Sequence, residues 1–216
     1  MKAIVILSGG MDSAVTLAYA VQKHGAENVI ALTFDYGQRH VKEMVAAQEL
    51  AQHFKVAWRG FNIDLTQIGG SALTDRHINV PEFKKDQKIW ERTQVALTYV
   101  PLRNTIFVSI AAAYAEVLSC KYIYTGFNYI DSGGYPDTRP AYVSAMNQLL
   151  IYGSRDKPQV VAPLIKLTKA QIVMLGVELL VPFEKTWSCY EGQEKPCGKC
   201  NACVQRKKGF DEAYVE

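Results

Sequence analysis

The sequence predicts an α/β fold, with a doubly wound, parallel five-stranded sheet followed by a small C-terminal subdomain. Three observations support this fold class. Short apolar runs alternate with segments of helical periodicity, a glycine-rich turn follows the first apolar run, and four cysteines gather near the C-terminus. Alternation of strand and helix patterns indicates parallel strands that are joined by crossover helices.

The predicted elements follow from these patterns in chain order. Residues 3–7 (AIVIL) form a continuous apolar run, as expected of a strand that is buried on both faces. Thr168 and Gln171 have the spacing of a capping box, which marks the start of the last predicted helix. We expect strands at residues 3–7, 29–34, 56–63, 122–125 and 160–162, and helices at residues 12–24, 41–54, 104–118, 139–151 and 169–180.

Residues 64–101 interrupt the alternation of strands and helices. The segment is long, charged and punctuated by Gly and Pro. Segments of this kind in compact domains are typically lids or binding loops, or else disordered. We predict a lid, inserted into a domain of residues 1–180, with residues 181–216 as the C-terminal subdomain. The charged residues at 84–92 are interpreted as a solvated face.

The composition is that of a globular protein. The 216 residues, 49% hydrophobic and 21% charged, fit one large domain or one domain with an appendage. No apolar run reaches membrane-spanning length, and the N-terminus lacks the pattern of a signal peptide, so we expect a cytoplasmic protein. A net charge of +3 is too weak to indicate nucleic acid as a partner.

The stretch LSGGMDSA, residues 7–14, lies where the first predicted strand meets the first helix. Glycines allow several backbone N–H groups to face one anion, and the helix that follows adds the positive end of its dipole. The patterns GxxxxGK[ST] and GxGxxG are both missing, so another phosphate-binding motif is indicated. Asp12 is unusual beside an anion, and we expect it to hold the loop or to bind Mg²⁺. The alternative is a plain glycine-rich turn.

The cysteines have the spacing of a metal site. Five are present, and four of them follow the pattern C-x7-C-x2-C-x2-C. Four thiolates complete a tetrahedron around zinc and leave no position for water, so we predict one structural Zn²⁺ per chain. An iron–sulfur cluster is the alternative. The predicted ligands are Cys189, Cys197, Cys200 and Cys203.

Several motifs together resemble one family. They are SGGMDS (8–13), FDYGQRH (34–40), GGSALTD (69–75), TYVPLRNTIF (98–107), SGGYPDTRP (132–140), APLIKLTKAQIVMLG (162–176) and TWSCYEGQEKPCGKC (186–200). The first is similar to the signature of the PP-loop ATP pyrophosphatase superfamily. The whole set is similar to the 7-cyano-7-deazaguanine synthase family of queuosine biosynthesis, over almost the entire chain.

This resemblance implies a Rossmann-like fold of the adenine nucleotide alpha hydrolase type and a homodimer. It also implies a ligase that forms carbon–nitrogen bonds. The substrates would be 7-carboxy-7-deazaguanine, ammonia and ATP, and the product would be 7-cyano-7-deazaguanine, formed through an adenylated acid and an amide.

The resemblance also suggests roles for individual residues. Arg103 and Lys169, at predicted helix starts, are expected to neutralise phosphate charge. Phe34 and Tyr36 follow the second strand and would border the adenosine or the purine-like ring. The implied ATP-binding residues are Ser8, Gly9, Gly10, Met11, Asp12, Ser13, Ala14, Phe34 and Tyr36, and the implied catalytic residues are Asp12, Arg103, Lys169, His40, Asp137 and Arg139.

Three of these residues have separate expected roles. Asp137 would accept hydrogen bonds from the deazaguanine, Arg139 would pair with the substrate carboxylate, and His40 would take a proton. Simpler structural roles stay open for Arg103, Asp137 and His40. Arg103 is alternatively a surface capping residue, Asp137 a turn former and His40 a bystander.

Two other functions are compatible with the same motifs. One is a PP-loop enzyme that thiolates tRNA, although such enzymes generally need an RNA-binding appendage or a redox cysteine pair near the ATP site. The other is a nucleotide-binding sensor without catalytic activity. Tight tRNA binding would favour the first of these, and absence of ATP turnover with acid and ammonia would favour the second.

Overall fold

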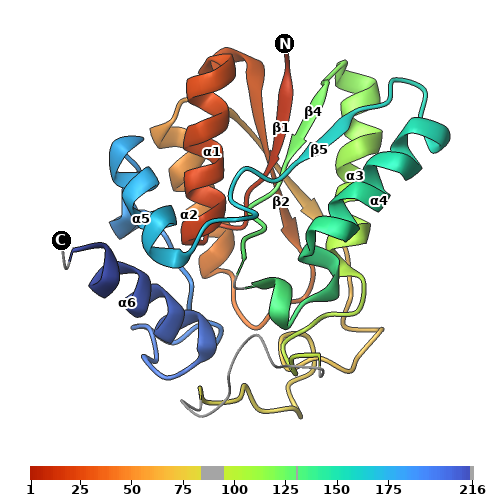
Figure 1. Cartoon of the computed structure of the whole chain (residues 1–216). Helices are drawn as coiled ribbons and strands as arrows, with labels where there is room; N and C mark the ends of the chain where they lie inside the picture. The colour runs from red at the N-terminus through yellow and green to blue at the C-terminus, as the bar shows by residue number, and fades with distance from the viewer. Residues whose placement is uncertain (84–94, 130, 215–216) are drawn as a thin grey trace.

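The computed structural model describes residues 1–83, 95–129 and 131–214 (Figure 1). Its centre is a parallel sheet with the strand order β3-β2-β1-β4-β5. Ala3 in the central strand lies opposite Val29 on one side and Tyr122 on the other. The strands are β1 (Ala3–Ile6), β2 (Val29–Asp35), β3 (Ala57–Asn62), β4 (Tyr122–Tyr124) and β5 (Gln159–Val161). This arrangement confirms the predicted fold class.

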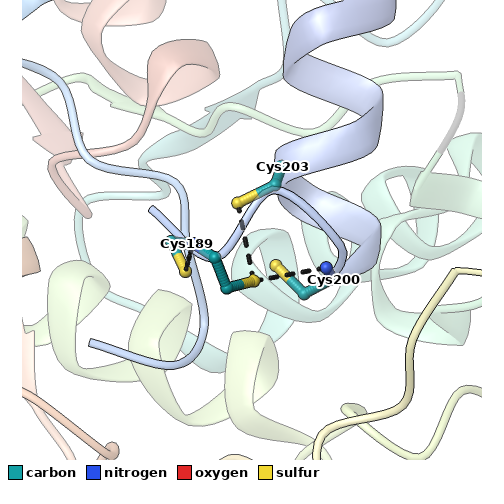
Figure 2. A group of neighbouring side chains, drawn as sticks. Cys189, Cys200 and Cys203 are labelled. Carbon is teal, nitrogen blue, oxygen red and sulfur yellow. Dashed lines mark hydrogen bonds between the residues drawn. The ribbon is translucent and has the colours of Figure 1, made fainter. Parts of the chain in front are cut away.

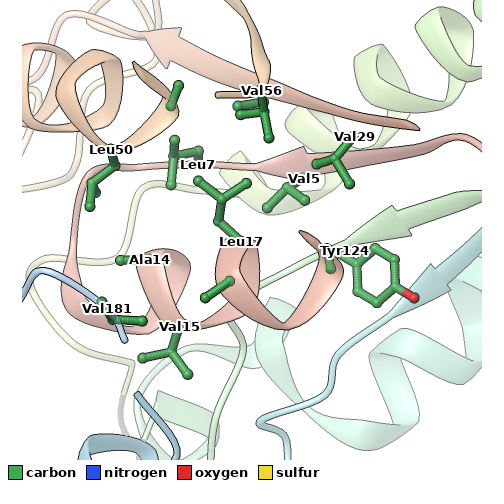
Figure 3. Close-up of a cluster of buried hydrophobic side chains, with 14 of the residues drawn as sticks. Val5, Leu7, Ala14, Val15, Leu17, Val29, Leu50, Val56, Tyr124 and Val181 are labelled. Carbon is green, nitrogen blue, oxygen red and sulfur yellow. The ribbon is translucent and has the colours of Figure 1, made fainter. Parts of the chain in front are cut away.

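Helices cover both faces of the sheet (Figure 1). One face carries α1 (Met11–His24), α2 (Lys42–His53) and α5 (Lys169–Glu178), and the other carries α3 (Arg103–Leu118) and α4 (Pro140–Gly153). The core beneath α1 contains aliphatic side chains of β1, β2 and α2, with Tyr124 at its edge (Figure 3). Because β1 is covered on both faces, its residues read as a continuous apolar run.

Each predicted helix of the first 180 residues is present, and the boundaries differ by a few residues. The capping box forms as predicted, since the Gln171 amide donates to Thr168 Oγ1 and the Thr168 amide donates to Gln171 Oε1. Helix α4 starts at Pro140, and Arg139 becomes its N-cap because proline fits the first helical position. Short 3-10 turns lie at Ala26–Asn28, Asp131–Gly133, Pro136–Thr138 and Phe183–Lys185. No helix in the described ranges combines the length and apolar character needed to cross a bilayer.

The C-terminal segment contains a helix that the sequence patterns did not predict, α6 (Asn201–Ala213). It packs along α5, and Gly209 contacts Lys169 so closely that an added Cβ would lie 2.8 Å from Lys169 Cβ. Most of the exposed side chains of α6 are charged, and its buried positions are Cys203, Gln205 and Gly209, which give no clear apolar stripe. Helix α6 therefore depends on contacts with α5 and on the segment that precedes it, residues 187–200, which we call the cysteine turn.

The insertion between β3 and α3 rests against the C-terminal segment. Arg39 fixes its first part, donating to the carbonyls of Ala72 and Ile78 at 2.5 Å each. Residues 82 and 83 of the insertion contact the cysteine turn. Glu82 forms a β-bridge with Cys200, and the Phe83 amide donates to the Lys199 carbonyl. The charged stretch at residues 84–92 lies entirely outside the described residues, and the lid function stays a prediction.

Candidate functional site

The glycine-rich loop lies at the carboxyl end of β1, beside β4, where the connections that leave these two strands pass through helices on opposite faces of the sheet. In open parallel sheets, ligands bind in the crevice at such a point. Gly10 is the N-cap of α1, and no side chain caps this helix. Within the described part of the chain, no acceptor pairs with the amides of Met11, Asp12 and Ser13. The start of α1 is therefore available to an anion.

Hydroxyl groups hold the loop in shape. The Ser13 hydroxyl donates to the Gly10 carbonyl at 2.9 Å and accepts from the Ser8 amide at 3.2 Å. Ser8 Oγ lies 3.1 Å from Ser13 Oγ. These bonds fix the curvature of the loop without using the N–H groups of the first helical turn as donors.

Two glycines allow the backbone to approach its neighbours closely. Gly9 has φ +83, and an added Cβ would lie 2.2 Å from the Glu43 carbonyl oxygen of α2. Gly126, which follows β4, contacts the start of α1, where an added Cβ would lie 3.1 Å from the Ser13 amide nitrogen. The loop is therefore held between α2 and the segment after β4.

A charged cluster forms the wall beside the loop. Lys169 Nζ donates to Asp12 Oδ2 at 2.7 Å. Burial alone would lower the pKa of Lys169, but the carboxylates of Asp12 and Asp131 outweigh it and raise this pKa. Asp131 accepts from Asn128 Nδ2 at 2.6 Å, and burial raises the pKa of its carboxyl group. The second oxygen of Asp12 is buried without a partner in the described structure.

A second cation lies across the cavity, at the first turn of α3. Arg103 Nη1 donates to the Tyr36 hydroxyl at 3.1 Å, and burial raises the pKa of Tyr36 to about 12. Burial opposes the charge of Arg103, but Tyr36 and Asp137 overcome it and raise the pKa of the guanidinium. Asp137 Oδ2 accepts from the Asn104 amide at 3.1 Å and so caps α3.

These groups surround a cavity of about 230 Å³. The loop and Lys169 contribute its polar wall, and aromatic rings contribute an apolar one. Phe34 stacks on Phe107 with centroids 4.1 Å apart and planes 5° apart, and Tyr36 is tilted against Phe107. An anion-binding end beside an aromatic end suits a ligand that joins phosphate to a planar ring.

The four predicted metal ligands converge (Figure 2). Their sulfur atoms all lie within 4.8 Å of one another, and Cys197 Sγ is 3.9 Å from Cys203 Sγ. Tetrahedral bonds of 2.3 Å to zinc would place sulfurs about 3.8 Å apart. Backbone amides of Glu191 and Cys197 donate to Cys189 Sγ at 3.4 and 3.3 Å and hold this sulfur in place. The donor set fits one metal ion.

The cysteine turn contacts the glycine-rich loop directly. The Trp187 amide donates to the Gly9 carbonyl at 2.9 Å, and Trp187 Nε1 donates to the Cys189 carbonyl at 2.9 Å. His40 Nε2 lies 2.9 Å from the same carbonyl oxygen, and its ring meets Trp187 edge to face. The C-terminal segment therefore supports the loop from behind and contributes Trp187, Ser188, Tyr190, Asn201, Ala202 and Gln205 to the cavity.

Comparison with known proteins identifies the family of the chain. The profile of the queuosine biosynthesis protein QueC matches residues 2–214. The chain belongs to the QueC family. It is 50% identical to the 7-cyano-7-deazaguanine synthase of Thermoplasma volcanium, over 98% of this chain and 87% of the relative. The enzyme of the same name from Trichodesmium erythraeum is 45% identical, over 98% and 96%. Membership of the QueC family marks the chain as an enzyme and favours nitrile synthesis over tRNA thiolation.

Solved structures share the QueC-like fold at low identity. NMN synthetase from Francisella tularensis superimposes with a TM-score of 0.53 and 17% identity, over 91% of this chain and 70% of that one. The U34-tRNA thiolase NcsA from Methanococcus maripaludis, solved with its [4Fe-4S] cluster, gives 0.51 and 13%, over 98% and 64%. At this identity, these likenesses establish the fold alone.

The structure of this QueC-family chain brings together most of the predicted site residues. Phe34, Tyr36, Arg103 and Lys169 all line the cavity with the loop. Gly9, Ala14, His40, Asp137 and Arg139 do not line it. His40 instead contacts the cysteine turn, Asp137 caps α3, and Arg139 is exposed at the start of α4.

Other residues of the QueC-like cavity were not singled out from the sequence. Glu43 lies in the first turn of α2, and Asp131 follows β4. Both positions come after the carboxyl ends of strands, and this placement is the signal that sequence analysis could have used. Tyr135 and Tyr190 reach the cavity through contacts between distant segments, for which the sequence carries no local signal.

Proposed function

We propose that this chain converts 7-carboxy-7-deazaguanine, ammonia and ATP into 7-cyano-7-deazaguanine, and so acts as a ligase that forms a carbon–nitrogen bond. The observation that carries the proposal is the free N-terminus of α1, which faces a cavity with Lys169 and Arg103 on its walls. A carboxylate does not expel oxide, so its oxygen must first be activated, and these groups suit the binding of the activating nucleotide.

Several residues of the loop and of the cavity wall would bind phosphate together. The amides of Met11, Asp12 and Ser13 would donate to phosphate oxygens, and Ser8 would add a hydroxyl. Lys169 and Arg103 would stabilise the negative charge that develops on the leaving phosphate. Gly9 acts indirectly, because its close contact with α2 sets the curvature of the loop.

Asp12 fits both roles expected from the sequence. One oxygen accepts from Lys169 and thereby holds the start of α1 against α5. Its other oxygen is buried without a partner, and a carboxylate oxygen is a ligand suited to Mg²⁺. Bound Mg²⁺ would neutralise phosphate charge at this edge of the cavity.

The substrate ring would pack against the aromatic wall of Phe34, Tyr36 and Phe107. Asp137 retains one buried oxygen without a partner, which supports a polar role at the start of α3. The proposed pairing of Arg139 with the substrate carboxylate gains no support from its exposed position. His40, bonded to the cysteine turn, is better suited to positioning that turn than to proton transfer.

We also propose that the four cysteines hold structural Zn²⁺. A single ion places all four sulfurs around one centre, whereas a cluster would distribute them over several irons and hold them farther apart. The sulfur separations support the single ion. The homodimer that the resemblance implies remains a proposal.

A direct assay tests the reaction. Purified protein, incubated with 7-carboxy-7-deazaguanine, ATP, Mg²⁺ and ammonium, should produce the nitrile, as measured by mass spectrometry. Ser8→Ala is the control, and it should lower the yield because Ser8 Oγ accepts from the Gly10 amide and contacts Ser13 Oγ. The absence of nitrile above this control would exclude the proposed reaction.

A further inference from the structure

Glu43 occupies a place in the cavity to which the mechanism above gives no task. It lies in the first turn of α2, and its backbone carbonyl contacts Gly9 of the glycine-rich loop. Its side chain is half-buried and lines the cavity. Glu43 therefore lines the same cavity as the loop proposed to bind the leaving phosphate.

The surroundings of Glu43 leave its carboxylate chemically available. Arg103 of α3 and Tyr36 after β2 are the ionisable groups that face it. Among the described residues, none donates a hydrogen bond to it or forms an ion pair with it. Burial raises the pKa of Glu43 to about 7, and the charge of Arg103 opposes this rise only in part. A base with such a pKa is well matched to neutral pH.

The other acidic groups near the cavity are engaged. In the described part of the chain, three carboxylates line it, and they belong to Asp12, Glu43 and Asp131. Asp12 accepts from Lys169, and Asp131 accepts from Asn128. Each of these two bonds occupies one oxygen of the carboxylate and holds it in place, whereas Glu43 has no such partner in the described structure.

The proposed reaction needs a proton acceptor three times, because ammonia brings three hydrogens and the nitrile nitrogen keeps none. When ammonia attacks the activated acid, a C–N bond forms, the adenylate oxygen leaves with its electron pair, and the new nitrogen must lose one proton to give the amide. Activation of the amide oxygen leaves two protons on this nitrogen: one is lost to give a neutral imidate, and the other is lost as the activated oxygen leaves and the triple bond forms. All three protons come from one nitrogen at one carbon, so one nearby base can accept them in succession.

We propose that Glu43 is the general base that removes these protons from the substrate nitrogen. This inference rests on the proposed function, because it deepens the chemistry of the same site. Arg103 would keep the carboxylate in place and would balance its charge after each proton is passed on to solvent. Glu43 would then be the catalytic residue of the ammonia-dependent steps and would not be needed for activation of the acid.

Glu43→Gln tests whether Glu43 serves only the ammonia-dependent steps. Glutamine has nearly the same shape as glutamate but cannot act as a base. The variant's rate of nitrile formation should fall about 100- to 10,000-fold, the usual contribution of a general base. In a single turnover without ammonia, its acid-dependent cleavage of ATP should stay within a few-fold of wild type. Glu49→Gln, on the exposed face of the same helix, is the matched control and should behave as wild type in both assays.

Two further measurements separate a base from a structural carboxylate. With unprotonated ammonia held constant, the wild-type rate should rise as pH increases through the ionisation of Glu43, and Glu43→Gln should lose this dependence. Formate should restore part of the activity of Glu43→Ala.

Nitrile synthesis by Glu43→Gln at the rate of Glu49→Gln would overturn the proposal. A parallel loss of ATP cleavage in Glu43→Gln would also overturn it, since the carboxylate would then serve nucleotide binding or folding. Failure of the proposed function is a different result, because wild-type protein would then make no nitrile at all.

Discussion

At the scale of single residues, the side chain of Lys169 is buried in the cavity wall and remains charged because Asp12 and Asp131 lie beside it. Its position at a helix start was visible in the sequence, and so was its proposed role toward phosphate. Its partner was not visible, because Asp12 and Lys169 are 157 positions apart and meet only when α1 packs against α5.

Lys169→Met should therefore destabilise the fold as well as weaken nucleotide binding. Removing the lysine leaves buried carboxylate charge without compensation. We expect a loss of about 3 kcal/mol, near the lower end for a broken buried pair because the Asp12 side chain is 24% exposed. Urea denaturation at pH 7 measures it.

The surface pair of Lys207 and Asp211 provides the comparison for this variant. Its side chains are 75% and 58% exposed, so Lys207→Met should cost about 0.5 kcal/mol or less. Equal losses in the two lysine variants would contradict the importance of the buried pair.

At the scale of elements, the strands and the first five long helices follow from local patterns, whereas α6 does not. Apolar runs and the capping box act within a few residues, so the sequence alone reveals them. Helix α6 is polar and begins directly after Cys200, and its buried side packs on α5. Its stability depends on long-range packing and, as proposed, on the metal, neither of which leaves a periodic pattern.

Metal removal should affect nucleotide binding as well as the C-terminal segment. Metal analysis of the purified protein should give about one zinc per chain and no stoichiometric iron. After chelation, α6 should lose helicity while the sheet domain stays folded, and ATP affinity should fall at least about 10-fold because Trp187 no longer supports Gly9. Circular dichroism and calorimetric titration measure the two effects.

Restoring zinc should reverse both changes. Cys120→Ser is the control for loss of a cysteine that is not a proposed ligand, and it should keep its zinc. Cys120 lies in the core, away from the cysteine turn. Unchanged ATP affinity in the stripped protein would show that the C-terminal segment does not support the loop.

At the scale of the whole molecule, the cavity is built from segments that span most of the chain. The order of strands decides this, because it places the ends of β1, β2 and β4 side by side. Sequence patterns predicted parallel strands but not their order, so the neighbours of the loop, including Glu43, could not be derived from them. The half-buried positions of Glu43 and Asp131 in the cavity wall are a consequence of this assembly.

The free energy of unfolding should depend on pH through these groups. Burial raises the pKa of Glu43 to about 7 from 4.5, so the folded state binds the proton more tightly than the unfolded state. This contribution is fully present below pH 4.5 and is lost as pH rises through about 7. Glu43→Gln should therefore be more stable than wild type at pH 8, and the difference should shrink as pH falls.

Thermal or urea unfolding of the two proteins between pH 5 and pH 8 checks this expectation. A constant difference across this range would mean that Glu43 titrates normally in the folded state, and the argument for a buried base would lose its support.

The hydrogen bond from the Trp187 amide to the Gly9 carbonyl has a consequence for biosynthesis. Translation reaches Trp187, whose backbone supports the glycine loop, only 178 residues after Gly9. A nascent chain therefore carries the loop long before it can hold a nucleotide firmly. Premature termination anywhere before this tryptophan should yield a polypeptide without the site, even where most of the sheet has already formed.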